Sequence, residues 1–122
     1  MEWYRLSAAQ EYPDAQDRLA FAYEYGRGVD RNIAKAMYWR TKAANHGLPS
    51  AQLALGIGYM RGNLVSADHV LAFKWLDLAA KKSSGPKYIQ HFAIRYRDQL
   101  KTTMTPEELA KAQEMVRTWH PD

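Results

Sequence analysis

The chain has 122 residues, of which 47% are hydrophobic and 25% charged, and its formal net charge at pH 7 is +4. These values are ordinary for one folded domain, and the absence of cysteine excludes disulfides and thiolate metal sites. No run of about 20 apolar residues is present, which excludes a membrane-spanning helix. No basic start followed by an apolar run occurs near the N-terminus, so we expect no signal peptide and a cytoplasmic protein.

Two parts of the chain are similar to each other at a spacing of 36 residues. Residues 15–47 align with residues 51–83 without a gap, and ten of the 33 aligned pairs are identical. Composition alone would give roughly two or three. A fixed period of this length is typical of stacked helical repeats. The identical pairs are Ala15/Ala51, Gln16/Gln52, Leu19/Leu55, Tyr23/Tyr59, Gly26/Gly62, Val29/Val65, Ala36/Ala72, Trp39/Trp75, Ala43/Ala79 and Ala44/Ala80.

In chain order, residues 1–12 match the second half of a repeat, because Trp3 falls at the position of Trp39. This half repeat lacks the helix that should precede it, so we expect an exposed apolar face with Trp3 as its largest group. A second copy of the chain is one candidate to cover that face, which makes a weak homodimer an alternative.

Each full repeat is predicted to form two antiparallel helices. Leu and Ala at helical spacing predict the first helices at about 15–25 and 51–61, capped by Asp14 and Ser50. The second helices are predicted at about 33–46 and 69–82, capped by Asn32 and Asp68.

Glycines mark the ends of the first helices and one point inside a helix. Gly26 and Gly62 are predicted to end the two first helices. Gly56 lies within its helix at the place that Ala20 takes in the first repeat, and we expect close helix packing there.

Residues 86–122 are predicted to form two capping helices that end the stack. A third copy at the same spacing would place Ala, Leu and Tyr where the chain has Lys87, His91 and Arg95, so the repeat is lost. An apolar stripe still predicts a helix that seals the stack, through Tyr88, Phe92, Tyr96 and Leu100. Residues 105–108 read as a capping box that begins the last helix.

The pattern Ala-Gln-x-x-Leu-(Ala/Gly)-x-x-Tyr-x-x-Gly, then Val, then Ala-x-x-Trp-x-x-x-Ala-Ala, resembles the Sel-one-like repeat family. This family is a relative of the tetratricopeptide repeats, and the resemblance is specific from residue 15 to residue 80. The ending MTPEELAKAQEMVRTW is similar to that of bacterial members. The resemblance implies an all-α fold, a right-handed α/α superhelix of antiparallel helix pairs, and a role as an adaptor or scaffold in protein complexes.

In tetratricopeptide-like stacks the first helix of each pair lines the concave side. The residues that lie between the core positions of these helices should therefore face a groove: Asp17, Phe21, Glu24, Tyr25, Leu53, Ile57, Met60 and Arg61. Tyr96 and Arg97 would extend the row. The set is too apolar for a plain solvated face, which favours a groove that binds a peptide or helix of a partner protein. The alternative is that the final helix folds into this groove and buries the same residues.

The chain carries no pattern that predicts catalysis, a metal or a cofactor. Its four histidines lie far apart without a partner at metal-ligand spacing, and nothing assembles an acid, a base and a stabilising group. We therefore expect a non-catalytic protein-interaction module. Nucleic-acid binding is the alternative, because basic residues lie near aromatic ones. That cluster is Arg27, Arg31, Lys35, Arg40 and Lys42, with Tyr38 and Trp39.

Overall fold

The computed structural model describes residue 5 and residues 12–62, 65–82 and 85–122. The regular structure in these ranges is helical, and its elements follow in sequence order: α2 (Pro13–Tyr25), α3 (Ile33–Asn45), α4 (Pro49–Arg61), α5 (His69–Lys81), α6 (Lys87–Lys101) and α7 (Pro106–Thr118). The predicted all-α class is confirmed.

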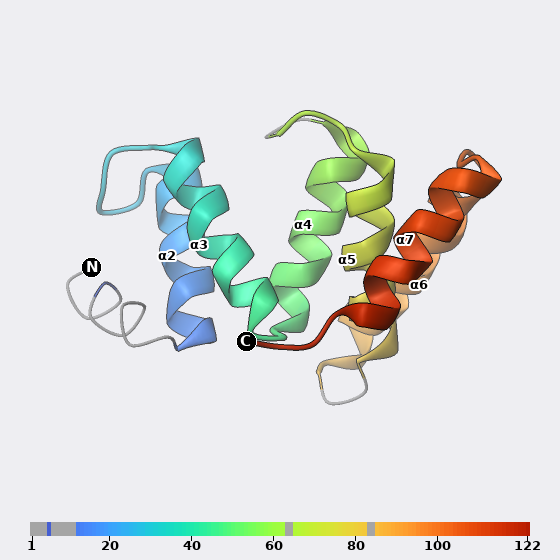
Figure 1. Cartoon of the computed structure of the whole chain (residues 1–122). Coiled ribbons are helices and arrows are strands. Elements are labelled where there is room, and N and C mark those ends of the chain that lie inside the picture. The colour runs from blue at the N-terminus through green and yellow to red at the C-terminus, as the bar shows by residue number, and fades with distance from the viewer. Residues whose placement is uncertain (1–4, 6–11, 63–64, 83–84) are drawn as a thin grey trace.

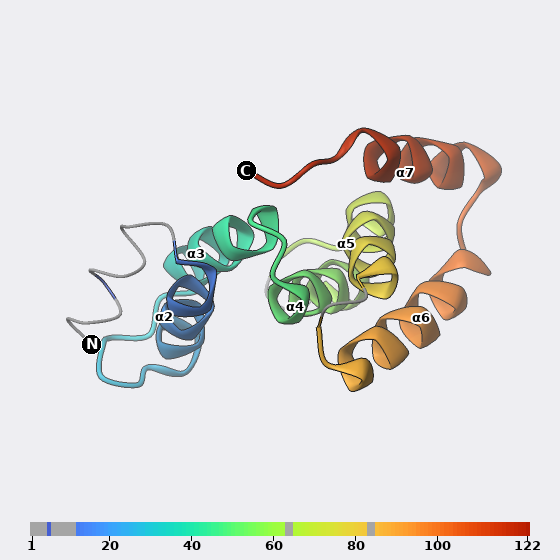
Figure 2. The same ribbon diagram turned by 90° about the horizontal axis from the view of Figure 1, so that it is seen from below.

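The helices stack in two layers. α2 packs on α3 and α4 packs on α5, while α3 also contacts α4 and so joins the two pairs. Figure 1 shows the pairs side by side along the chain. Figure 2 shows that α2, α4 and α6 form one layer and α3, α5 and α7 the other. This arrangement confirms the predicted solenoid of helix pairs.

Proline rather than a side-chain cap begins the first helix of each repeat. α2 starts at Pro13 and α4 at Pro49, and the residues before them make no side-chain capping bond. Proline has the backbone angle of a first helical residue and needs no N–H partner. The predicted caps at Asp14 and Ser50 are therefore wrong, since both residues already lie inside their helices.

The predicted caps of the later helices are confirmed. Asn32 Oδ1 accepts the Lys35 N–H at 3.0 Å, and Asp68 Oδ1 accepts the Leu71 N–H at 3.0 Å. Thr105 forms the expected capping box with Glu108 at the start of α7. Each bond satisfies a backbone donor that the first turn of a helix leaves free.

The turns inside the two repeats begin and end alike. Gly26 and Gly62 end the first helices with φ of 68° and 69°, in the left-handed region that favours glycine. The loop then returns to the same point of the helix, where the N–H of Asn32 donates to Tyr23 O at 2.8 Å. The N–H of Asp68 donates to Tyr59 O at 3.0 Å in the second repeat.

Small residues allow the helices to approach closely in the core. Trp75 of α5 is buried against alanines of α3 and of α4. A Cβ added to Gly56 would lie 2.6 Å from Leu76 Cγ, so α4 and α5 meet where a side chain would not fit. The close packing expected at Gly56 is confirmed.

α6 continues the repeat pattern with a changed spacing. Gln52 Nε2 donates to Ala44 O at 3.1 Å, and Gln90 Nε2 donates to Ala80 O at 2.9 Å. The two acceptors are 36 residues apart and the two glutamines 38, so the chain is two residues longer between α5 and this point of α6. α6 packs on α5 and also contacts α4, so it follows α5 as α4 follows α3.

This shift changes which side of α6 is buried. Ile89, Ala93 and Leu100 face the core, whereas Tyr88 and Phe92 are exposed. The predicted sealing stripe is therefore wrong for Tyr88 and Phe92.

The chain ends on the opposite layer. α7 packs on α5, and the segment after it runs back to α3, where the Asp122 N–H donates to Asn45 O at 2.9 Å. Figures 1 and 2 show the C-terminal end beside the α3–α4 junction. The alternative that the final helix fills the groove is therefore wrong. Among the described residues, no helix is long and apolar enough to cross a membrane.

Candidate partner-binding face

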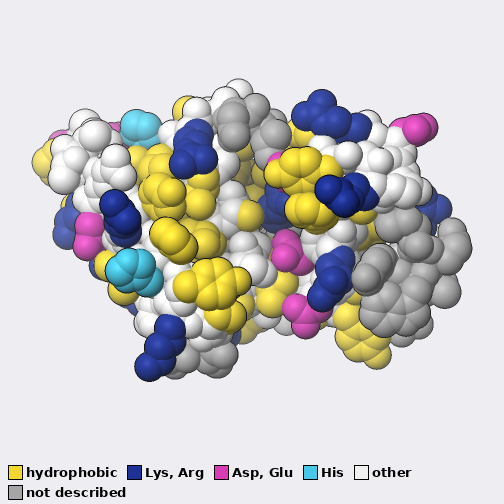
Figure 3. Space-filling model, turned by 180° about the vertical axis from the view of Figure 1, so that it is seen from behind, with side chains coloured by type: hydrophobic (Ala, Val, Ile, Leu, Met, Phe, Trp, Pro, Cys, Tyr) yellow, Lys and Arg dark blue, Asp and Glu magenta, His cyan; other side chains and the backbone are white. Residues whose placement is uncertain are grey.

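The exposed sides of α2, α4 and α6 make one surface, here named the first-helix face. Large aromatic side chains stand out from it: Phe21 is 48% and Tyr25 59% exposed on α2, and Tyr88 is 64% and Phe92 40% exposed on α6. Figure 3 looks onto this face and shows hydrophobic and basic side chains next to one another. Exposed apolar groups gathered in this way are typical of an interaction surface.

Several of these side chains are held by ring contacts. The ring centroids of Phe21 and Tyr25 lie 4.6 Å apart, and the Arg27 guanidinium lies 5.8 Å from the Phe21 centroid. The Arg61 guanidinium lies 5.8 Å from the centroid of Tyr96. Such contacts between a cation and a ring are favourable, and they position both arginines at the edge of the aromatic patches.

A pocket of about 280 Å³ opens between α2 and α4 on the first-helix face. This volume lies just below the range of about 300–1,000 Å³ for small-molecule sites. It suits one or two side chains of a partner better than a cofactor. The pocket brings together five of the eight predicted groove residues, and its lining is Phe21, Glu24, Tyr25, Arg40, Ala54, Ile57, Gly58 and Arg61.

A partly buried cluster of charges includes two of the residues that line this pocket, Glu24 and Arg40. Arg40 of α3 is buried, with its Nη1 2.7 Å from Glu24 Oε1 and its Nε 4.0 Å from Asp17 Oδ1. Ser50 Oγ donates to Asp17 Oδ2 at 3.2 Å. Burial raises the pKa of Asp17, and the attraction of Arg40 offsets only part of that rise. Asp17 and Glu24, which were predicted as groove residues, therefore also compensate the positive charge of Arg40.

The second repeat has apolar residues at the equivalent places. Leu53, Met60 and Leu76 lie 36 residues after Asp17, Glu24 and Arg40. Leu53 and Met60 are half-buried against the core that α5, α6 and α7 share. These two predicted groove residues mainly join the second repeat to the C-terminal helices.

Two further predictions about site residues have different outcomes. Arg97 was expected to extend the groove, but it donates from Nη1 to Asp77 at 3.0 Å, on the side facing α5. That expectation is wrong, because the two-residue shift turns α6 about its axis. Trp3, the predicted end-face contact, lies outside the described residues.

Sequence reasoning missed Tyr88 and Phe92 as members of the first-helix face. A comparison at a spacing of 38 would have placed them at the positions of Ser50 and Ala54, which lie on the exposed side of α4. The paired glutamines Gln52 and Gln90 are the signal for that spacing.

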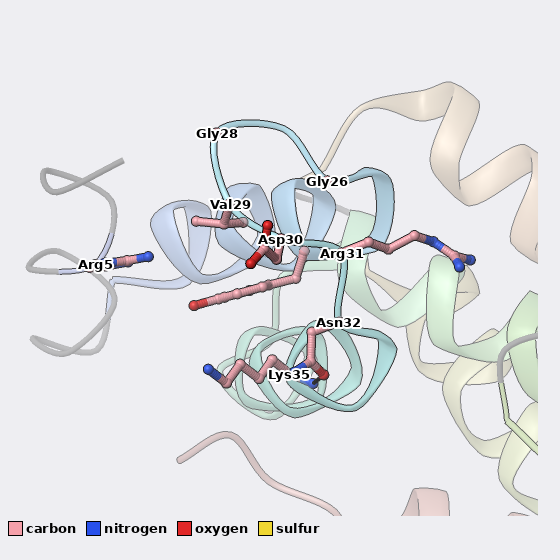
Figure 4. A pocket seen from close by; sticks show the side chains of 9 residues that line it. Arg5, Gly26, Gly28, Val29, Asp30, Arg31, Asn32 and Lys35 are labelled. Carbon is pink, nitrogen blue, oxygen red and sulfur yellow. Dashed lines mark hydrogen bonds between the residues drawn. The ribbon is translucent and has the colours of Figure 1, made fainter.

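The basic cluster around α3 does not form one surface. Arg40 is buried, and Arg31 Nε donates to Glu24 O at 2.9 Å. A hollow of about 700 Å³ lies nearby, and Tyr23 and Lys35 both line it. Lys35 Nζ lies 5.4 Å from the centroid of the Tyr23 ring, and Figure 4 shows that Arg31 points away from Lys35. Asp30 also lines this hollow, so its charge is mixed. In the described part of the chain, no three His, Cys, Asp or Glu residues are grouped so as to hold a metal ion.

The stacked pairs, their repeated turns and the exposed aromatic face define an α/α repeat protein of the solenoid class. The chain belongs to the Sel1 repeat family, whose sequence profile matches residues 1–12, 13–48 and 49–84. Each of the two longer matches is one 36-residue period long. The predicted resemblance is thereby confirmed.

Solved structures of two bacterial proteins are similar to this chain. A protective antigen of uropathogenic Escherichia coli with an SLR fold is 32% identical, with a TM-score of 0.83 over 95% of this chain and 24% of that one. A Sel1 repeat protein from Oxalobacter formigenes is 34% identical, with a TM-score of 0.67 over 77% of this chain and 69% of that one.

The curated relatives are much longer proteins. Chitin synthase regulatory factor 3 of Schizosaccharomyces pombe is 38% identical over 66% of this chain. The matched segment covers 9% of the yeast protein. An uncharacterized protein of Neisseria meningitidis is 34% identical over 72% of this chain. The matched segment covers 18% of the Neisseria protein. Sel1 repeat proteins generally mediate protein–protein interaction, and their fold is typically a non-catalytic scaffold.

Proposed function

We propose that this chain is a protein-interaction module that holds a peptide or a helix of a partner on the first-helix face. The observation that carries the proposal is the exposure of Phe21, Tyr25, Tyr88 and Phe92 on one face. The first two of these side chains line the pocket between α2 and α4. Aromatic residues and arginine contribute most of the binding energy in protein interfaces, and this face combines both. The fission-yeast relative is named a regulatory factor of chitin synthase, which supports a role exerted on another protein.

The exposed aromatic side chain of α3, in the other layer, lies away from the pocket. On α3, Tyr38 is also exposed, but it lies against Lys42 and the edge of Trp39, away from the pocket. An exposed aromatic of similar size on each layer provides a matched pair of variants.

The test is capture of partners from a nuclease-treated lysate of the source organism, with the purified chain immobilised. We expect the same proteins to be enriched by the wild type and by Tyr38→Ala, and to be lost with the double variant Phe21→Ala, Tyr25→Ala. Circular dichroism first establishes that all three chains are folded. Retention of the same proteins by the double variant would contradict the proposal, and enrichment only without nuclease would favour nucleic acid instead.

A further inference from the structure

A glycine borders the pocket between α2 and α4 without a packing reason. Gly58 is buried in the last turn of α4, and a Cβ added there would meet nothing within 4 Å beyond its own stretch of helix. The first repeat has Ala22 at the equivalent place. Alanine is favoured over glycine inside a helix, so the chain keeps the less stable residue at a point where alanine would fit.

Gly56 shows what a packing glycine looks like in the same helix. It lies two residues before Gly58, and a Cβ there would lie 2.6 Å from Leu76 Cγ. Contact with α5 therefore explains Gly56 and leaves Gly58 unexplained. The space beside Gly58 belongs to the pocket, which points to a ligand group rather than to the fold.

The walls of this pocket fit a large apolar side chain. Phe21 and Tyr25 of α2 line one side and Ile57 of α4 lines the other, and the volume is about 280 Å³. Aromatic side chains at a surface pocket are where single anchor residues of a partner contribute most to binding.

The charges around the pocket favour an acidic neighbour for that side chain. The one carboxylate that lines the pocket, Glu24, is already paired with the buried Arg40 at 2.7 Å. Arg61 lines the pocket as well and is exposed, and within the described residues it forms no ion pair. Arg27 is also exposed, and its guanidinium lies over the ring of Phe21. A carboxylate of the partner would complete this arrangement.

We infer that the pocket beside Gly58 is an anchor site for a peptide that carries a large apolar side chain next to an aspartate or glutamate. The apolar side chain fills the space between Phe21 and Ile57, and Arg61 binds the carboxylate. This inference rests on the proposed function, because it specifies which chemistry the first-helix face recognises.

The test begins with a displayed library of random linear peptides, selected on the whole wild-type chain. The recovered peptides are synthesised, and their binding is measured by fluorescence anisotropy. We expect them to share a large apolar residue adjacent to Asp or Glu. Gly58→Leu is expected to weaken their binding by at least about tenfold, because its side chain occupies the pocket. The exposed control Lys111→Glu on α7 is expected to leave binding unchanged.

A charge exchange tests the role of Arg61 separately. Arg61→Glu should weaken the acidic peptides and should bind versions with Lys in place of the acid better than the wild type does. Arg61 is exposed, so this variant tests the site even where Gly58→Leu fails to fold. Gly58→Ala should raise the melting temperature by about 4 °C, because it fits and favours the helix.

The outcomes separate this inference from the proposed function. Peptides that require Phe21 and Tyr25 but bind equally well to Gly58→Leu and Arg61→Glu would overturn the anchor site and leave the interaction face intact. Peptides that are indifferent to all four changes would overturn both. A selection that enriches nothing over an empty support, or peptides without the apolar–acidic pair, would also overturn the anchor site.

Discussion

The buried charges between the first two repeats allow a direct test of how the stack is stabilised. Arg40 is 7% exposed and compensates Glu24 and Asp17, whose side chains are 15% and 28% exposed. Arg40→Leu leaves two partly buried carboxylates without their cation, a change that typically costs about 3–5 kcal/mol. We expect about 3 kcal/mol, because water reaches Asp17. For a domain of this size that loss lowers the melting temperature by about 12 °C.

The second repeat indicates which substitutions should restore the stability that Arg40→Leu removes. Its equivalent positions are apolar, and Leu76 lies against Gly56, where a Cβ would be 2.6 Å from Leu76 Cγ. Ala20 is equivalent to Gly56 and Arg40 to Leu76, so the exchange includes Ala20→Gly to give the new leucine the same room. The transferred set is Asp17→Leu, Glu24→Met, Arg40→Leu and Ala20→Gly. We expect it to unfold with a free energy within about 1 kcal/mol of the wild type or above it, because well-packed apolar groups replace a buried ion pair.

The assay is urea unfolding of the three chains, followed by far-UV circular dichroism at neutral pH. The slope of the free energy with urea should stay similar, so that a change in midpoint reports a change in stability. The reasoning is refuted if Arg40→Leu is as stable as the wild type. It is also refuted if the fourfold variant is less stable than Arg40→Leu alone.

Three smaller changes test other parts of the description. Gly56→Ala should lower the unfolding free energy by about 1–3 kcal/mol despite its helix preference, because its methyl group overlaps Leu76; equal stability in urea would contradict this. Because burial raises the pKa of Asp17, the folded chain binds that proton more tightly than the unfolded chain does. The contribution of Asp17 to the free energy of unfolding therefore falls as the pH rises from the ordinary aspartate pKa through the raised pKa of the folded chain. Asp17→Asn should abolish that fall, and a melting curve with the same pH dependence as wild type would refute it. Gln90→Ala should cost about 1 kcal/mol through the lost bond to Ala80 O; an unchanged melting temperature would count against α6 as a first helix of the repeat.

Much of the fold was predictable because its signals are local. The identities at a spacing of 36 report positions where small residues and Trp75 must pack, whatever the rest of the chain does. The caps at Asn32, Asp68 and Thr105 act within one turn of helix, so their residue types suffice to place them. The predicted starts of α2 and α4 were wrong because a proline directly precedes each predicted capping residue. The helix begins at that proline, so the capping residue already lies inside the helix.

The candidate site was predictable only in part. Phe21, Tyr25, Ile57 and Arg61 line the pocket, since helical spacing alone puts them on the exposed side of α2 and α4. The ion pair between Glu24 and Arg40 was not predictable, because Arg40 lies on another helix. In the sequence Arg40 cannot be told apart from an exposed surface cation. Tyr88 and Phe92 were assigned to the wrong side of α6, because a two-residue change of spacing turns a helix by more than half a turn.

The sequence by itself determined the helical class, the repeat length, the Sel1 family and the faces of α2 and α4. These follow from periodicity, which is a property of neighbouring residues. Only the tertiary structure decided that α7 lies on α5 and that the first interface holds a buried charge cluster where the second holds leucines and a methionine. It also decided that the space beside Gly58 is open. Such features depend on which side chains from different helices meet, and the distance between helices is set by the packing of the whole stack.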